Sequence, residues 1–285
     1  MALRFLQLIS LTLLSSGLSA EHKPPRSQEA VRDFMVVLFR HGERAPLGTW
    51  ERDPNGNYTW PLGFGELTKD GRDNMYYIGM WLRGSFGRFM TDDIRDVGAR
   101  SSPVPRCFDS AALVLYGLYP ASQRWAWKDN EDWQPVPITT VLADHDMYTD
   151  IAAKLKDYYY PANTAAKYGD TMAPLDVPVK IKERLHLFSY HDLNLIAVLY
   201  SLNPNEIKTR PDYGSLVIFE SAYHPLANEQ EIRVFFRDGD TNAVLYNMTG
   251  CPYPCKLSSF LNYVEETFTP VTARECGIPE DYILL

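Results

Sequence analysis

The stretch from Phe34 to Pro46, FMVVLFRHGERAP, decides the predicted fold. Its first six residues are apolar and include two adjacent valines, which is typical of a strand buried on both faces of a parallel sheet. Charged residues begin directly after this strand, at Arg40 and His41. Open α/β sheets bind their ligands at the carboxyl ends of their strands. The sequence therefore predicts an α/β fold with a site just after this strand.

The rest of the chain alternates helical and extended patterns. Thr68 is a predicted N-cap for a helix within residues 65–89, where apolar residues recur at helical spacing. A second buried strand is predicted at residues 185–189, and His191 and Asp192 follow it. Further helices are predicted over residues 109–118, 151–159 and 193–202, and further strands over residues 215–219 and 231–236.

Length and charge limit the function classes. The chain has 285 residues, 45% of them hydrophobic, which is enough for one large α/β domain or a domain with a small cap. A net charge of −8 and a pI of about 5.3 argue against nucleic acid and anionic lipid as partners. A local arginine cluster can still bind a small anionic substrate.

Residues 1–20 are predicted to be a signal peptide, with an early charge at Arg4, an apolar stretch over residues 5–14 and a small residue at the end. The alternative is a buried strand or helix at this position. No other apolar run is long enough to cross a bilayer, so we expect no transmembrane anchor and export to the extracellular space or a lysosomal lumen. Export would make Asn57 and Asn247, each in an Asn-X-Thr sequon, candidates for glycosylation.

The four cysteines are an even number, as expected of an exported chain. Three pairings are possible in principle. Cys251 and Cys255 could close a short local loop, which would leave Cys107 with Cys276. A metal site is weakly supported, because the CxxxC segment lacks a second Cys or His pair nearby.

The arginines and the histidine after the first strand have the chemistry to act on phosphate esters. Arginine binds phosphate oxygens with two parallel hydrogen bonds and keeps its charge. Arg40 and Arg44 flank His41, and Arg100 is a third candidate. A neutral histidine is a nucleophile toward phosphorus, and nearby arginines disfavour its protonated form. Alternatives are a solvated turn, or an arginine-rich loop that binds sulfate, heparin or the carboxylate of a partner.

The second histidine and the aspartate after it have roles in the same chemistry. His191 could stabilise the transferring phosphoryl group beside His41, and Asp192 could protonate the leaving oxygen. A carboxyl group that must be protonated to act favours an acidic optimum.

The segment RHGERAP matches the RHGxRxP signature of the histidine acid phosphatases, branch 2 of the histidine phosphatase superfamily. Further segments resemble motifs of this family and follow in its order, so the resemblance runs from about residue 33 to the C-terminus. These segments are LTKDG at residues 67–71, GMWLR at 79–83, RSSPVPRC at 100–107, GLYP at 117–120 and SYHD at 189–192.

The resemblance implies roles for the candidate residues and requires no metal or other cofactor. His41 would be the phosphorylated nucleophile and Asp192 the general acid, and His191 would complete the pocket. The phosphoryl oxygens would be held by Arg40, Arg44 and Arg100.

The resemblance also implies a fold, disulfides and partners. The fold is a parallel-rich central sheet flanked by helices, in a domain over residues 21–285 with a helical cap inserted. Cys251–Cys255 and Cys107–Cys276 match two disulfides usual in the family. The partners would be phosphate monoesters, and a homodimer is possible.

Two departures from the family pattern concern the pocket. His191 follows Arg100 by 91 residues, a much shorter interval than is usual in the family, so the cap region at residues 121–184 is predicted to be reduced or missing. A compact member, a splice form and an incomplete gene model all explain this. Tyr190 replaces a usually small residue and is expected to narrow the pocket.

Two function hypotheses remain. The first is a secreted acid phosphatase, a phosphoric monoester hydrolase that works through phosphohistidine on His41 with Asp192 as proton donor. The alternative is a catalytically weakened or inactive secreted glycoprotein that binds phosphate esters. A P-loop enzyme and a Ser-His-Asp hydrolase are not supported, because neither GxxxxGK[ST] nor GxSxG occurs.

Overall fold

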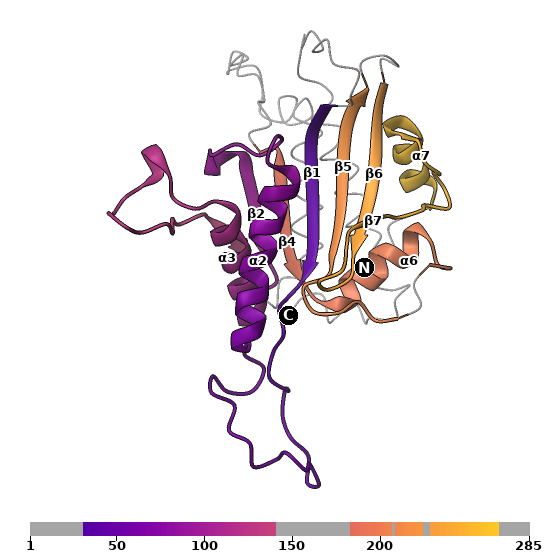
Figure 1. Ribbon diagram of the computed structural model, residues 1–285. Helices are drawn as coiled ribbons and strands as arrows, with labels where there is room; N and C mark the ends of the chain where they lie inside the picture. Colours follow the sequence, from indigo (N-terminus) through magenta and orange to yellow (C-terminus); the bar gives the residue numbers. More distant parts are fainter. Residues whose placement is uncertain (1–30, 141–182, 207–208, 225–228, 268–285) are drawn as a thin grey trace, which may run out of the picture.

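The computed structural model describes residues 31–140, 183–206, 209–224 and 229–267. The described strands form one eight-stranded sheet in the order β3-β2-β4-β1-β5-β6-β7, with β8 paired to β6 (Figure 1). The strands are β1 (Val31–Arg40), β2 (Val97–Ser101), β3 (Ile138–Thr140), β4 (Leu185–Tyr190), β5 (Leu216–His224), β6 (Glu229–Arg237), β7 (Val244–Leu245) and β8 (Cys255–Lys256).

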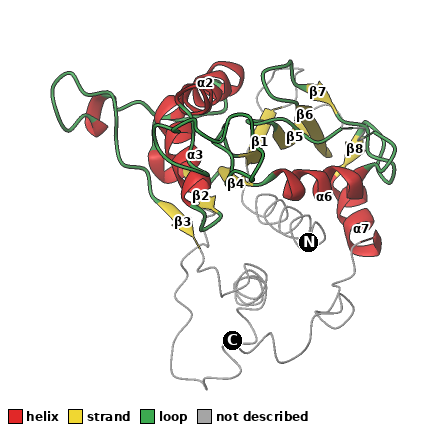
Figure 2. Cartoon of the chain, turned by 90° about the horizontal axis from the view of Figure 1, so that it is seen from below, coloured by secondary structure: helices red, strands yellow, loops and turns green. Residues whose placement is uncertain are grey.

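The sheet is half parallel and half antiparallel. Strands β3, β2, β4 and β1 run parallel to one another, and β5 pairs with β1 in the antiparallel direction. Helices cover both faces: α2 (Lys69–Phe86) and α3 (Pro105–Leu118) lie on one, and α6 (Asp192–Leu202) and α7 (Leu257–Thr267) on the other (Figure 2). The predicted α/β architecture with helices around a central sheet is confirmed.

Strand β1 shows why the run of apolar residues is continuous. Successive side chains of a strand point to opposite faces. Phe34, Val36 and Leu38 pack against α6 and α7, and Met35, Val37 and Phe39 pack against α2 and α3. All six are at most 1% exposed, since both faces of the strand are covered.

Helix α2 begins where its capping residue predicts. The Thr68 hydroxyl accepts a hydrogen bond from the Gly71 N–H at 3.0 Å, which satisfies one of the free donors of the first turn. Helices α2 and α3 cross closely at Gly79 and Gly117, where an added Cβ would overlap backbone of the facing helix. This close crossing brings the first turns of both helices to the carboxyl ends of the parallel strands.

The sequence analysis did not predict some of the observed helices and strands, and some of its predictions lie outside the described residues. Neither β2 nor α7 was predicted, and the short 3-10 helices η1 (Ile94–Asp96) and η2 (Gln123–Trp125) were not either. The helix predicted at residues 151–159 and the signal peptide at residues 1–20 lie outside the described residues, as does most of the reduced cap region. Among the helices that the structure describes, none has the length and apolar character needed to cross a membrane.

The predicted disulfides have different outcomes. Cys251 and Cys255 are bonded, with their Cα atoms 5.4 Å apart. Cys107 is a free thiol in the described part of the chain. Because Cys276 lies outside the described residues, the Cys107–Cys276 bridge remains a prediction. The Cys107 side chain has no exposed surface, and its Sγ lies 3.6 Å from the Tyr190 carbonyl oxygen.

Candidate active site

Two histidines meet because they follow neighbouring parallel strands. Strands β1 and β4 pair in register up to Arg40 and Tyr190, and the His41 N–H donates to the Tyr190 carbonyl at 3.0 Å. The residue that follows β4 is His191, whose ring centroid lies 5.5 Å from that of His41 in an edge-on arrangement. The structure thus brings together the two predicted histidines at the carboxyl edge of the sheet.

The contacts of His41 fix which ring nitrogen carries the proton. Its Nδ1 lies 2.8 Å from the Gly42 carbonyl oxygen, so Nδ1 is the protonated nitrogen that donates. Its Nε2 accepts a hydrogen bond from Nε of Arg106 at 3.1 Å and therefore carries the lone pair. The pKa of His41 is lowered from 6.5 to about 3, mainly by burial; the hydrogen bond to Gly42 opposes the shift, and the charge of Arg106 adds to it. His41 is therefore a neutral imidazole with Nε2 toward an arginine.

Arg40 is held rigidly beside His41. Its Nη1 donates to the Pro211 carbonyl at 2.7 Å, and its guanidinium carbon lies 3.9 Å from the centre of the Tyr213 ring. Burial lowers its pKa, which the carboxylate of Asp192 opposes. In the described part of the chain, the Nε atoms of Arg40 and Arg44 are both buried without a hydrogen-bond partner. Two buried cationic donors without a partner, on the arginines that flank His41 in the sequence, suit an anion.

Glycines let the loop after β1 lie against the start of α2. A Cβ on Gly42 would lie 2.6 Å from the Gly71 carbonyl oxygen, closer than real Cβ contacts. The Gly42 N–H donates to Ser110 Oγ of α3 at 3.1 Å. Arg44, which is half-buried, forms a β-bridge with Leu67 just before α2. The loop is therefore fixed by both helices on this face of the sheet.

The arginine that contacts His41 from outside the RHGERAP loop is Arg106, which the sequence analysis did not select. It lies in the first turn of α3. Arg100, the residue selected instead, lies in β2 opposite Phe188 of β4 and is half-buried. Both arginines stand in the RSSPVPRC segment, so the signal for Arg106 was present in the sequence.

His191 is the N-cap residue of α6. Its Nε2 lies 3.2 Å from Oγ of Ser102, and its ring lies beside the Cys107 thiol. Burial is the main cause that lowers the pKa of His191, followed by the charge of Arg106. Burial also raises the pKa of the Cys107 thiol to about 12, so the thiol stays protonated.

Asp192, the first residue of α6, is a buried carboxylate in an ion-pair cluster. Its Oδ1 accepts from the Leu193 N–H at 2.9 Å. Its Oδ2 accepts from Nε of Arg210 and lies 3.4 Å from Nη2 of Arg40. Burial alone would raise the pKa of Asp192, but Arg210, Arg40 and the Leu193 N–H together hold it below its ordinary value. Arg210 is a further site residue that the sequence analysis missed.

Tyr190 does not narrow the pocket as expected. It alternates along β4 with Ser189, shares the face of Phe188, and lies 3% exposed in the core beside α6. An aromatic side chain that does lie beside His41 is Tyr213, whose ring centroid lies 5.7 Å from that of His41.

Residues 33–173 match the sequence model of the histidine phosphatase superfamily (branch 2). The chain belongs to this family. The matched residues include His41 and its arginines, whereas His191 and Asp192 lie beyond them.

Curated relatives of this histidine phosphatase include acid phosphatases. It is 35% identical to prostatic acid phosphatase of Mus musculus over 148 residues, which are 51% of this chain and 36% of that protein. It is 34% identical to lysosomal acid phosphatase of Homo sapiens over 139 residues, 48% of this chain and 33% of that protein. The chain thus spans about a third of the length of these relatives.

Solved structures with the same fold include bacterial phytases. The phytase from Citrobacter braakii superposes with a TM-score of 0.56 at 13% identity, over 84% of this chain and 98% of that one. The phytase from Klebsiella sp ASR1 gives a TM-score of 0.59 at 13% identity, over 88% of this chain and 98% of that one. At this identity the likeness establishes the fold alone.

Proposed function

We propose that this chain hydrolyses phosphate monoesters as an acid phosphatase, through a phosphohistidine formed on His41. The observation that carries the proposal is the neutral, buried imidazole whose Nε2 lone pair points at Arg106. The two arginines that flank His41 in the sequence also have buried Nε–H groups without a partner among the described residues. The activity of the named relatives supports the same reaction class.

The proposed reaction has two steps. In the first, Nε2 of His41 attacks phosphorus, the N–P bond forms and the bond to the leaving oxygen breaks. Arg40, Arg44 and Arg106 hold the phosphoryl oxygens and stabilise the charge that develops on them. Arg100 remains a predicted fourth contact to the phosphoryl group.

Proton transfer involves Asp192 in both steps. Its carboxyl group in the protonated form gives its proton to the leaving oxygen, which departs as an alcohol. In the second step, water attacks the phosphohistidine while the Asp192 carboxylate accepts its proton, and phosphate leaves. His191 lies beside His41 and would stabilise the phosphoryl group in both steps.

The two groups together favour acid conditions. His41 has a pKa of about 3 and so remains a neutral nucleophile at pH 5. Asp192 must be protonated for the first step, and its pKa is lowered, so turnover of esters with poor leaving groups should increase as the pH falls.

We further propose export to the extracellular space or a lysosomal lumen, with removal of residues 1–20. The Cys251–Cys255 disulfide is typical of an oxidising compartment. Asn57 and Asn247 are both exposed, as glycosylation would require. A homodimer remains a prediction.

Trapping of the phosphoenzyme tests the proposal. The full-length protein and His41→Ala are mixed with radiolabelled phosphate ester, quenched in alkali and analysed for acid-labile label, and hydrolysis of p-nitrophenyl phosphate is measured from pH 4 to 8. We expect label and acid-favoured turnover in the wild type, and neither in His41→Ala. A folded wild type that binds the ester without label or turnover would refute the phosphatase and support the ester-binding glycoprotein.

A further inference from the structure

Both carboxylate oxygens of Asp192 lie beside hydrogen-bond donors. Oδ1 faces the Leu193 N–H, and Oδ2 faces both Arg210 and Arg40. The charged and titratable groups that act on Asp192 are Arg40 at the end of β1, Arg210 from the segment before β5, and His191, the N-cap residue before it. Asp212 and Tyr213, also from the segment before β5, act on Arg40. In this arrangement Asp192 accepts hydrogen bonds and carries no proton to give.

The two cations on Asp192 differ in how they are held. The Arg40 side chain is 6% exposed and is fixed by the Pro211 carbonyl and the Tyr213 ring. The Arg210 side chain is 65% exposed, and in the described part of the chain its ion pair is with Asp192. Arg210 can therefore swing into solvent without opening the core, whereas Arg40 cannot.

We propose that Arg210 is a positioning residue that acts through Asp192: it holds the carboxylate as an anion and must release it before Asp192 can protonate a leaving group. This inference rests on the phosphatase function proposed above. Release lets the Asp192 carboxylate take a proton from solvent. That proton passes to the ester oxygen as the P–O bond breaks and the bond between phosphorus and His41 Nε2 forms.

Arg210 has the opposite effect on the second step. Asp192 is then a carboxylate again and accepts the proton of the attacking water. A paired Arg210 favours this anionic form. Its charge thus favours dephosphorylation of His41 and opposes phosphoryl transfer from esters whose leaving group needs a proton.

The test compares pH profiles of wild type and Arg210→Gln with two substrates. With 2-glycerophosphate, a poor leaving group, the alkaline limb of kcat/KM should move up by about one pH unit when the opposite charge is removed. With p-nitrophenyl phosphate, whose leaving group needs little protonation, the profile should change much less. KM should change less than twofold, because other arginines hold the phosphoryl group.

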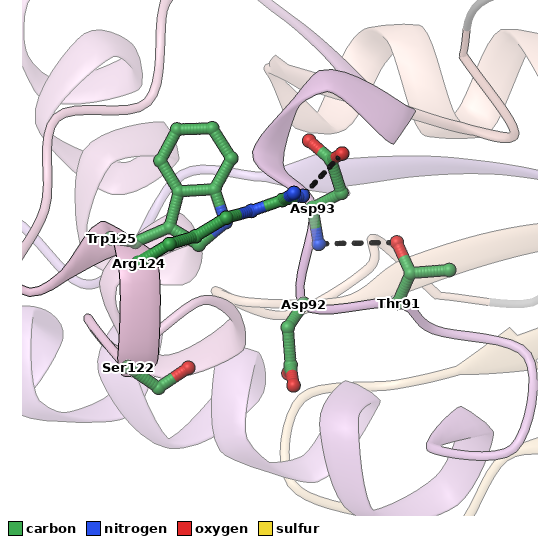
Figure 3. Close-up of a pocket in the computed structure, with 6 residues that line it drawn as sticks. All are labelled: Thr91, Asp92, Asp93, Ser122, Arg124 and Trp125. Carbon is green, nitrogen blue, oxygen red and sulfur yellow. Dashed lines mark hydrogen bonds and ion pairs between the residues drawn. The ribbon is translucent and has the colours of Figure 1, made fainter.

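Three variants separate this role from a structural one. Arg210→Lys keeps the charge and should shift the limb less than Arg210→Gln. In an Asp192→Asn background, Arg210→Gln should have no further effect on the profile, since the group it acts on is gone. Arg124→Gln is the matched control: this side chain is 63% exposed and pairs with Asp93 at 2.7 Å, at the amino end of β2 (Figure 3). It should leave the profile unchanged.

Direct titration of the Asp192 carboxyl group tests the proposal even if the variants show no measurable turnover. The carboxyl carbon of ¹³C-labelled Asp192, assigned with Asp192→Asn, should titrate about one unit higher in Arg210→Gln than in the wild type. Equal titration midpoints, or overlapping profiles in an active enzyme, would overturn the role of Arg210 and leave the phosphatase intact. Absence of turnover and of the phosphoenzyme in the wild type would refute the proposed function, while the titration still decides the role of Arg210.

Discussion

Acidification should destabilise this fold through His41. The imidazole is 3% exposed, and burial is the main cause that lowers its pKa from an ordinary 6.5 to about 3 in the folded chain. Because the folded value is the lower one, the unfolded chain binds more protons between these two pH values. The stabilising contribution of neutral His41 is therefore complete above pH 6.5 and is lost progressively as the pH falls toward 3.

The magnitude follows from the two pKa values. Between pH 7 and pH 4, linkage with values of 6.5 and about 3 gives a loss of about 3 kcal/mol in the free energy of unfolding from this one residue. His186 has a pKa lowered by burial to about 4 and should contribute in the same direction, so the wild type should lose more than this.

Urea unfolding of wild type and His41→Asn at pH 7 and pH 4 isolates the contribution. The asparagine amide can still donate to the Gly42 carbonyl but does not titrate in this range. The variant should lose about 3 kcal/mol less than the wild type over the same interval. Equal losses in the two proteins would show that His41 is not held neutral by the fold, and the argument for a neutral nucleophile would fail with it.

Two further predictions concern Arg106 and the crossing of α2 and α3. Arg106→Gln should lower kcat/KM for p-nitrophenyl phosphate by about 100-fold or more, because one charged donor at the developing charge is lost; a change below about threefold would remove Arg106 from the site. Gly79→Ala should destabilise the fold by about 1–3 kcal/mol in thermal unfolding, because its Cβ would overlap the Val114 carbonyl. Gly84→Ala, in the same helix but with open space around its Cβ, should instead stabilise by about 1 kcal/mol, and similar effects of the two changes would contradict the close crossing.

The sequence predicted the parts of this fold in which one strong local signal acts. The run FMVVLF could only be buried on both faces, and β1 is. Thr68 marked the start of α2 through its side-chain cap. Strand β2 was missed because VGARS has a glycine and an arginine on its half-buried side and no apolar run.

The candidate site was predictable only where its residues are adjacent in the sequence. The RHGERAP motif carries His41 with its two arginines. Which of Arg100 and Arg106 contacts His41 depends on where β2 ends and α3 begins. The sequence of β2 has no clear strand pattern, so it does not reveal this boundary. The contact of Arg210 with Asp192 spans 18 residues and depends on the path of the segment before β5, so no local pattern indicates it.

The positive charge of the site has opposite consequences for the two reacting groups. It adds to burial, the main cause, in lowering the pKa of His41, and against burial it helps to hold the pKa of Asp192 below its ordinary value. For the nucleophile this is favourable, since the imidazole stays neutral at acid pH. For Asp192 as the proposed proton donor it is unfavourable, since the proposed first step needs the carboxyl in its protonated form. Of the two arginines that contact Asp192, Arg40 also faces the nucleophile and is fixed by the core, so Arg210 is the one whose movement can change the state of the donor while leaving the nucleophile neutral.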